Sequence, residues 1–306
     1  MPLSAKPLEP CAVAIAARPS QREGAIHRDM REPVSLIAGI LQAQGYTPVI
    51  EQSTAHDLLG LPWRAFDFDA ISEQCGLVIA VGGDGTLISV GRQVAPHNVP
   101  VIGVNQGRLG FLTDLSLANV AQSLPKILRG EYREERRVLI EAKSNVSETA
   151  FLAMNDVVVN RGGATSLVDL EISLDDRFAY GFRADGVIVA TPTGSTAYAL
   201  SANGPIMAPF VNAFTIVPIA PHALTNRPIV IADDSEIRIT VARAREAFAS
   251  IDGHHYIPLS EGDSITLKRA AASVRLWHPL DYDYYHTLRE KLGWTETPEG
   301  LAPLKK

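Results

Sequence analysis

Unbroken apolar runs recur along the first part of the chain, separated by longer amphipathic segments. A strand with one face in water alternates apolar and polar residues, so continuous runs predict strands that are covered on both faces. The runs that predict such strands lie at residues 11–17, 47–50, 76–82 and 99–104.

Helical spacing appears between these predicted strands. Residues 33–44 place Val34, Ile37 and Leu41 on one face, and Gly45 follows as a helix-ending residue. Residues 87–94 and 116–129 are also predicted to be helices, whereas residues 18–30 and 57–68 predict irregular structure. The repeated strand–helix order predicts an α/β N-terminal domain built on an open, mostly parallel sheet.

The pattern changes near residue 131, where short strand-like segments replace the helices. The predicted strands lie at residues 136–142, 153–160, 167–174, 187–190, 213–218, 229–231, 236–241, 264–267 and 273–276. The alternation within residues 236–241 is typical of antiparallel strands with one buried face. This half is therefore predicted to be a β-rich, sandwich-like C-terminal domain, with a short helix at residues 194–200.

The two patterns predict three parts of the chain. Residues 11–131 form the α/β domain, residues 132–280 form the β-rich domain, and residues 281–306 form a tail. Tyr282, Tyr285, Leu288 and Leu292 have helical spacing in that tail, so we expect a helix that packs back on a domain.

Composition narrows the class of protein. Of 306 residues, 46% are hydrophobic, which is ordinary for a globular protein, and the net charge is −6 without a long basic run. The sequence therefore predicts neither a nucleic-acid partner nor a membrane partner. The two cysteines make no zinc site, and the short apolar run at 12–17 is too short for a signal peptide, so a cytoplasmic location is expected.

Three glycines and one carboxylate occupy the turn after the predicted strand at 76–82. The stretch Gly82-Gly83-Asp84-Gly85-Thr86 leads directly into the predicted helix at 87–94. Bare backbone and the free N–H groups of a helix start can bind phosphate, and a neighbouring carboxylate can accept a proton from a hydroxyl. This pattern indicates phosphoryl transfer with Asp84 as the base; the alternative is a tight turn in which Asp84 caps the helix.

A second polar loop, residues 105–112, follows the next predicted strand. The carboxyl ends of parallel strands share one edge of a sheet, so this loop and the glycine turn are expected to face one site. Its Arg108 is a candidate phosphate ligand, although a solvated loop arginine is an equally good interpretation.

Two polar stretches stand out in the β-rich half. Asn155 and Asp156 could bind a nucleoside through donor and acceptor groups, or could simply form the turn at a strand entry. Residues 191–201 form a Thr-, Gly- and Ser-rich turn that suits phosphate or ribose oxygens, with Tyr198 available for stacking. A serine nucleophile at Ser195 is the weaker alternative, because the glycine spacing of a nucleophile elbow is missing.

Taken in order, these motifs resemble those of the NAD kinase family. The resemblance rests on the glycine turn, on Asn155-Asp156, on Asp185-Gly186 leading to the run from Thr191 to Tyr198, and on residues 221–228. It implies ATP-dependent phosphorylation of the adenosine ribose 2′-hydroxyl of NAD to give NADP. It also implies a divalent metal ion, Mg²⁺, that arrives with ATP, and a homo-oligomer, either a tetramer or a dimer.

The resemblance also implies residue roles. Asp84 matches the catalytic aspartate of the family. The resemblance assigns no metal ligand in this chain. The positions expected to bind phosphate are Gly82, Gly83, Thr86 and Arg108. The positions expected to contact NAD, some of them from a neighbouring subunit, are Gly85, Asn155, Asp156, Arg183, Asp185, Thr193, Thr196, Ala197, Tyr198, Ala199, Leu200, Ser201 and His254. Asn203 and His254 depart from the family pattern of glycine and glutamine.

Two other functions remain open on the sequence alone. Lipid and sugar kinases share the Gly-Gly-Asp-Gly turn, but they have no need of the segment 185–201. A non-catalytic sensor of NAD or NADP would need the binding residues and not Asp84.

Overall fold

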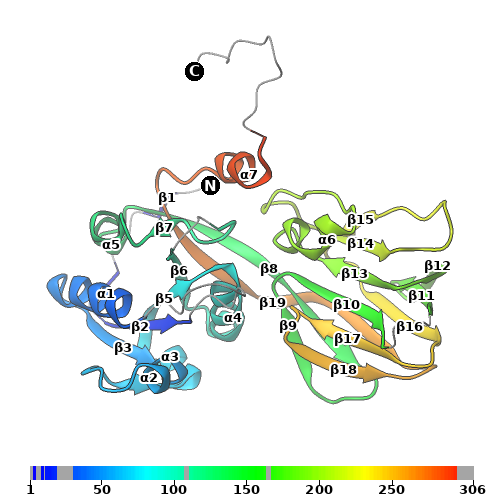
Figure 1. Ribbon diagram of the computed structural model, residues 1–306, viewed down its shortest axis with the longest axis horizontal. Helices are drawn as coiled ribbons and strands as arrows, with labels where there is room; N and C mark the ends of the chain where they lie inside the picture. Colours follow the sequence, from blue (N-terminus) through cyan, green and yellow to red (C-terminus); the bar gives the residue numbers. More distant parts are fainter. Residues whose placement is uncertain are drawn as a thin grey trace, which may run out of the picture. The chain divides into compact units, whose positions relative to one another are not determined.

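The computed structural model describes residues 3–4, 8–9, 11–18, 30–106, 110–162 and 167–294 (Figure 1). It divides into two compact units. The first contains the described residues up to Glu135 and those from Val274 onward, and the second contains Arg136–Ser273. Two strands, β8 (Tyr132–Ser144) and β19 (Ser264–Pro279), each have residues in both units. Residues 132–135 and 274–280, predicted to belong to the β-rich domain, are assigned to the first unit by this division.

The first unit alternates strands and helices as far as β8. Its elements are β1 (Leu3–Ser4), β2 (Ala12–Ala17), α1 (Arg31–Ala43), β3 (Thr47–Glu51), α2 (Gln52–Asp57), β4 (Ala65–Phe66), α3 (Phe68–Gln74), β5 (Cys75–Gly82), α4 (Asp84–Val94), the 3₁₀ turn η1 (Ala95–His97), β6 (Pro100–Asn105), β7 (Leu115–Ser116), α5 (Val120–Leu128) and α7 (Tyr284–Leu292). Among the described helices, none is both long enough and apolar enough to span a membrane.

The sheet of the first unit is parallel, with the strand order β19-β6-β5-β2-β3-β4. From β2 the chain proceeds outward to β3 and β4, and it then returns to place β5 and β6 on the other side of β2. The order reverses between β2 and β5, and ligands of open α/β sheets bind beyond the carboxyl ends of the strands at such a point. The glycine turn follows β5 and therefore lies at this position.

Both faces of this sheet are covered, as the unbroken apolar runs predicted. On β5, Leu77, Ile79 and Val81 belong to one buried cluster with residues of α1 and α5. The other face of the sheet packs against α3 and α4; Gly103 there lies against the side chain of Leu87. The α/β domain with a mostly parallel sheet is confirmed.

Two short helices lie in or next to the segment predicted to be irregular. The carboxylate of Glu51 caps α2 by accepting from the N–H groups of Ser53 and Thr54, and Asp67 caps α3 by accepting from Ala70. The helix predicted at 116–129 begins later, at Val120, because residues 115–116 instead pair with β6 as β7.

The second unit is built almost entirely from antiparallel strands. Besides parts of β8 and β19, its elements are β9 (Ala150–Ala153), β10 (Asp156–Arg161), β11 (Val168–Leu174), β12 (Arg177–Ala184), β13 (Gly186–Ala190), η2 (Gly194–Thr196), α6 (Tyr198–Ser201), β14 (Ala213–Ile219), β15 (Ile229–Ala232), β16 (Ile237–Arg243), β17 (Ala247–Ile251) and β18 (His255–Leu259).

Two sheets share one hydrophobic core in this unit. One sheet has the order β15-β14-β13-β10-β17-β18, and the other contains β12-β11-β16-β19 with β8 and β9. Val157 and Val189 from the first sheet and Ile172 and Ile239 from the second belong to the same buried cluster, which is the arrangement of a β-sandwich. The β-rich domain is thus confirmed.

Strands β12, β17 and β18 of this unit were not predicted, and the strand predicted at 153–160 corresponds to β10 and includes only the last residue of β9. The two strands predicted at 264–267 and 273–276 are one continuous strand, β19. The stretch between them, residues 268–272, contains charged residues and three alanines, which have low strand propensity, and pairing with neighbouring strands outweighs this preference.

The tail contains the expected helix. Asp283 caps α7 by accepting from Tyr285 N–H, and Gly293 ends it with φ +68°, a left-handed conformation that glycine adopts without strain. Thr287 and Leu288 are its buried residues, and the helix belongs to the first unit.

Candidate active site

The glycine turn joins the end of β5 to the start of α4, and its three glycines differ in their surroundings. At Gly82 a Cβ atom would overlap the side chain of Thr86, so the packing itself requires glycine. Among the described residues, no atom lies within 4 Å of a Cβ placed on Gly83 or Gly85, and Gly83 has φ −103°, which other residues adopt easily. Gly83 is half-buried and Gly85 is exposed, and neither carries a side chain that would keep a ligand away from the backbone.

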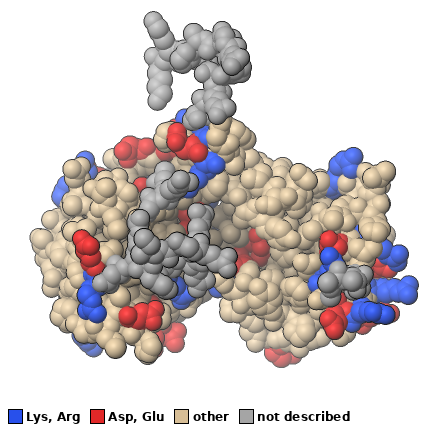
Figure 2. Space-filling view, viewed as in Figure 1, with Lys and Arg blue, Asp and Glu red and all other residues tan. Residues whose placement is uncertain are grey.

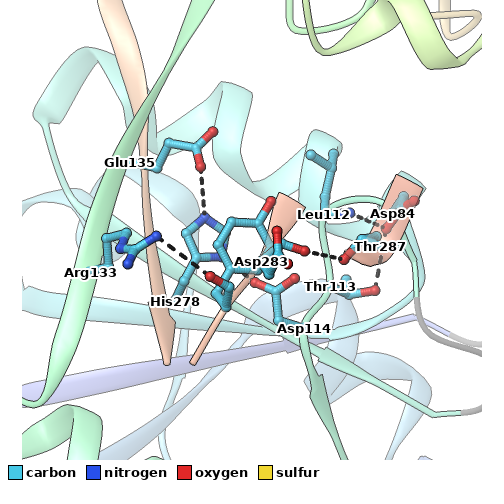
Figure 3. Close-up of polar contacts among 10 residues, drawn as sticks. Asp84, Leu112, Thr113, Asp114, Arg133, Glu135, His278, Asp283 and Thr287 are labelled. Atoms are coloured by element: carbon cyan, nitrogen blue, oxygen red, sulfur yellow. Dashed lines mark hydrogen bonds and ion pairs between the residues drawn. The ribbon is translucent and has the colours of Figure 1, made fainter. Parts of the chain in front are cut away.

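The Asp84 carboxylate is held by the loop that follows β6 (Figure 3). Its Oδ2 accepts a hydrogen bond from Phe111 N–H at 2.8 Å, and its Oδ1 accepts from Leu112 N–H at 3.1 Å and from the Thr113 hydroxyl at 3.3 Å. The N-cap of α4 is Gly83 and makes no side-chain capping bond. The interpretation of Asp84 as a helix cap is therefore wrong.

The loop itself is fixed by buried contacts. Thr113 is fully buried, and Asn105 at the end of β6 donates its side-chain amide to the Thr113 hydroxyl at 2.9 Å. A Cβ on Gly110 would overlap the Asp84 carboxylate, so glycine is needed for this close approach. The expectation that the two loops face one site is confirmed for the described residues; Arg108 lies outside them.

In the second unit, a single carboxylate organises the turn that enters β10. Asp252 accepts hydrogen bonds from the N–H groups of Met154, Asn155 and Asp156 at 2.9, 2.8 and 3.1 Å. Its own N–H donates to the carbonyl of Asp156, and its φ of +47° is left-handed. No local pattern predicts this set of hydrogen bonds, here called the Asp252 clamp, because the partners are almost 100 residues apart.

Asp156 is a buried carboxyl group beside that clamp. Burial raises its pKa to about 7, and the negative charge of Asp252 contributes in the same direction. A carboxyl group in this state can donate or accept a hydrogen bond near neutral pH, which suits recognition of a polar ligand.

The turn at residues 191–196 packs directly on this entry to β10. The Thr191 hydroxyl donates to the carbonyl of Met154 at 2.6 Å, and Thr191 N–H donates to the carbonyl of Asn155 at 2.9 Å. A Cβ on Gly194 would overlap that same Asn155 carbonyl. The structure therefore brings Asn155 and Asp156 together with the Thr-Gly-Ser turn, as one candidate site.

Ser195 is part of the framework of this turn. It is fully buried, its hydroxyl donates to the carbonyl of Pro192 at 2.7 Å, and the same oxygen accepts from Met207 N–H at 3.0 Å. A hydroxyl so enclosed has no access to substrate, so the nucleophile interpretation is excluded.

The remaining residues of the segment differ in accessibility. Thr193 is buried and its hydroxyl accepts from the buried guanidinium of Arg137 at 3.3 Å, a contact that the sequence did not reveal. Tyr198 is 43% exposed. Among the other residues predicted to contact NAD in this segment, Thr196, Ala197 and Leu200 are half-buried, Ala199 is buried and Ser201 is exposed.

Arg183 and Asp185 lie at the far end of β13 from this turn. Asp185 stands just before β13 and Thr191 just after it, a separation of about 20 Å at the rise of an extended chain. Arg183 pairs with Asp169 at 2.6 Å and Asp185 pairs with Arg161 at 2.8 Å. Figure 2 shows acidic and basic side chains close together at this end of the second unit.

His254 is exposed on the turn between β17 and β18, two residues after Asp252. This places it on the same turn as the clamp on Asn155 and Asp156. Asn203 adopts φ +62°, a left-handed conformation that explains why glycine is an alternative at that position. Within the described residues, His, Cys, Asp and Glu side chains form no group of three or more that could hold a metal ion.

A glycine turn at the switch point of a parallel sheet, with a carboxylate fixed beside it, is typical of enzymes that bind nucleotides and transfer phosphoryl groups. Comparison with known proteins narrows the class. The family model of the ATP-NAD kinase N-terminal domain matches residues 35–132, and that of the ATP-NAD kinase C-terminal domain matches residues 154–278.

Curated relatives match over nearly their whole length. The NAD kinase of Ralstonia nicotianae is 46% identical over 269 residues, covering 87% of this chain and 89% of the relative. The NAD kinase of Nitrosospira multiformis is 44% identical over 271 residues, covering 88% and 92%. The chain belongs to the NAD kinase family.

Solved structures agree with this assignment. A yeast NADH kinase complexed with NADH superposes with a TM-score of 0.81 at 26% identity, covering 97% of this chain and 90% of the other. An Archaeoglobus fulgidus NAD kinase in complex with ATP has a TM-score of 0.72 at 22% identity, covering 93% and 100%, and so shares the fold.

Proposed function

We propose that this protein is an NAD kinase, which transfers the γ-phosphoryl group of ATP to the 2′-hydroxyl of the adenosine ribose of NAD and releases NADP. The observation that carries the proposal is the fixed Asp84 carboxylate at the glycine turn, in a chain that matches both domains of the family. A base and an anion-binding turn are two of the parts that enzymes use for phosphoryl transfer to a hydroxyl.

Asp84 is the proposed base, and its two oxygens are not equivalent. Oδ1 accepts two hydrogen bonds, from Leu112 and Thr113, whereas Oδ2 accepts one, from Phe111, among the described residues. A carboxylate oxygen has two lone pairs in its plane, so Oδ2 retains the capacity to accept the ribose hydroxyl proton. The loop thus selects which oxygen faces the substrate.

The phosphates of ATP are proposed to lie on the bare backbone of Gly83 and Gly85 and the first N–H groups of α4. Mg²⁺ is usually held by one or two carboxylates together with substrate phosphates, so the proposed metal ion would enter with ATP. Bound in this way, Mg²⁺ would neutralise charge on the transferred group. The side chain of Thr86 packs directly against Gly82 in the turn. Thr86 and Arg108 remain proposed phosphate ligands.

Selection of NAD is proposed to come from the second unit. Asn155 and Asp156 offer donors and acceptors on a turn that Asp252 holds rigid, and the neighbouring segment from Thr193 to Ser201 supplies hydroxyls and the exposed Tyr198 ring. Such a preorganised polar turn loses little conformational entropy when the ligand binds. His254, on the adjoining turn, is the proposed further contact.

Arg183 and Asp185 require a different arrangement. Since about 20 Å of extended chain separates Asp185 from Thr191, these residues are proposed to contact NAD that is bound to another copy of the protein. A homo-oligomer, dimer or tetramer, follows from that proposal. The cytoplasm is the proposed location, which suits the free thiols of Cys11 and Cys75.

Production of NADP tests the function directly. The purified protein, incubated with NAD, ATP and Mg²⁺, is expected to form NADP and ADP in equal amounts, and to leave diacylglycerol and fructose 6-phosphate unphosphorylated. Absence of NADP together with intact NAD binding, measured by calorimetry, would contradict the proposal and point to a sensor instead.

A further inference from the structure

A buried histidine lies between two carboxylates in the first unit (Figure 3). His278, near the end of β19, has only 1% of its surface exposed. Its Nδ1 contacts Asp114 Oδ2, and its Nε2 lies 3.7 Å from Glu135 Oε2. Its ring stacks on Tyr282, with the ring centroids 4.1 Å apart and the planes inclined by 9°.

These side chains come from three separate parts of the unit. Asp114 belongs to the loop after β6, Glu135 to β8, and His278 to β19. The imidazole therefore links the loop to the two strands that have residues in both units. Burial of charged and polar groups costs free energy unless they are paired, and an apolar replacement of a buried ion pair is often as stable. Stability alone does not explain a polar cluster at this position.

The cluster adjoins the residues that hold Asp84. Asp114 follows Thr113 directly, and Thr113 and Leu112 both donate hydrogen bonds to Asp84 Oδ1. One planar peptide unit joins Asp114 to Thr113, so a displacement of Asp114 also alters the position of Thr113 and of the donors before it. Fixing Asp114 consequently fixes the orientation of the carboxylate.

We propose that His278 is a positioning residue for Asp84, which holds Asp114 in place and thereby aims the donors of residues 111–113 at the carboxylate. The inference rests on the proposed function, in which Asp84 accepts the ribose proton. Loss of this support would turn Asp84 away from the geometry that proton transfer requires, and misplacement by about 1 Å can cost up to roughly 100-fold in rate.

Trp277 provides a matched control. It is the preceding residue of β19, so its side chain points to the opposite face. It is 5% exposed, stacks on Tyr132 at 4.0 Å, and donates its indole N–H to Glu134 Oε2 at 3.1 Å. Trp277→Phe and His278→Gln thus each change a buried aromatic group that contacts a carboxylate, but only His278 contacts the loop that holds Asp84.

The first measurement compares turnover and stability in these variants. His278→Gln is expected to lower kcat by about 10- to 100-fold while KM for NAD changes little. Trp277→Phe is expected to lower the melting temperature and to leave kcat close to that of the unmodified protein. Equal losses of kcat in the two variants would show that general destabilisation, and not positioning, causes the effect.

The second measurement tests the connection to Asp84. Residues that act through one another are not additive, so His278→Gln is expected to cost little further activity when it is added to Asp84→Asn. An equal fold-loss in both backgrounds would overturn the inference. If the unmodified protein forms no NADP, the proposed function fails; if it is active and His278→Gln retains full kcat, only the positioning role fails.

Asp114 supplies an independent pair of variants should His278→Gln not fold. Asp114→Asn keeps an oxygen that can accept from the imidazole, whereas Asp114→Ala removes it. The asparagine variant is expected to retain more of kcat than the alanine variant, and the KM for NAD is expected to be similar in both. Unchanged kcat in the folded alanine variant would contradict the proposal.

Discussion

Asp84 in the first unit and Asp252 in the second each accept hydrogen bonds from several backbone N–H groups. They differ in whether the aspartate itself takes part in the proposed reaction. In the first unit Asp84 accepts from Phe111 and Leu112 and is itself the proposed base. In the second unit Asp252 accepts from three consecutive N–H groups, and the proposed ligand contacts are made by the clamped residues Asn155 and Asp156.

The comparison shows two ways to preorganise a site. Where the reacting group is also the clamp, support and chemistry reside in one side chain, and a substitution removes both. Where the clamp is a separate residue, support can be lost while the contacting side chains remain. The first arrangement gives an accurately aimed group, since three donors orient one carboxylate; the second leaves the contacting side chains free to differ among ligands.

The largest effect is expected from Asp84→Asn. A positioned base contributes about 10²–10⁴-fold, so kcat should fall by that factor. Stability should fall as well, because the new amide group would point an N–H at backbone donors, which costs about 1–3 kcal/mol. Steady-state kinetics and urea unfolding measure the two losses, and calorimetry is expected to show NAD binding retained.

Asp67→Asn is the matched control for that variant. Asp67 also accepts a backbone hydrogen bond, from Ala70 at 2.8 Å, at the start of α3. Its replacement should affect stability slightly and leave turnover unchanged. Near-normal turnover in Asp84→Asn would show that Asp84 is a clamp without a chemical role.

A smaller effect, confined to binding, is expected from Asp252→Asn. The three N–H groups lose a charged acceptor, and hydrogen bonds to charged groups contribute about 1.5–3 kcal/mol, so NAD affinity should fall by about 10- to 100-fold. The chemistry at Asp84 is untouched, so kcat at saturating NAD should persist. Calorimetric titration with NAD and kcat at saturation separate the two quantities.

Asp263→Asn serves as the control in the second unit. Asp263 accepts from Ser260 N–H at 2.7 Å in the turn between β18 and β19, away from Asn155. NAD affinity should not change in this variant. Equal weakening by both substitutions would mean that the unit as a whole, and not the clamp, determines binding.

The smallest effect concerns pH. Burial, and then the charge of Asp252, raise the pKa of Asp156 to about 7, so the folded state binds this proton more tightly than the unfolded chain, where the pKa is about 3.9. The contribution of Asp156 to the free energy of unfolding is therefore greatest below about pH 4 and decreases as pH rises through about 7; between about pH 6 and 8, the end of this range, the decrease is roughly 1 kcal/mol.

Asp156→Asn should remove this dependence, because an amide does not titrate. Urea unfolding of both proteins across that pH range measures it: the unmodified protein should lose stability relative to the variant as pH rises. Parallel curves would mean that Asp156 does not titrate in this range. The clamp on its backbone N–H is unchanged, which keeps this test separate from that of Asp252.

The sequence predicted those elements whose residues are consecutive and follow a single hydrophobic pattern. The apolar runs predicted β2, β5 and β6, and the glycine turn was located because its residues are consecutive. The capping of α2 by Glu51 was missed because glutamate is not a usual capping residue. Strands β12 and β18 are edge strands that pair as hairpins with the adjacent β11 and β17. Gly181 in β12 and Pro258 in β18 are unfavourable in strands, so the local pattern did not indicate them.

The sequence predicted which residues belong to the candidate site, but it did not predict how they are held in place. Asp84, Asn155 and Asp156 were named from the chain, but the hydrogen-bond partners that orient them come from residues 27 to 97 positions away. The segment from Arg183 to Ser201 was interpreted as one motif. Strand β13 separates its ends, because five extended residues occupy the middle of the motif.

The return of β19 to the first unit affects how the chain acquires its structure during synthesis. A ribosome releases residues in order, and N-terminal domains commonly fold first. Here β6 pairs with Arg275 and Leu276, and the loop that aims Asp84 is braced by His278. The α/β unit therefore cannot be completed until the entire β-rich unit has emerged, so the catalytic half is the last to mature.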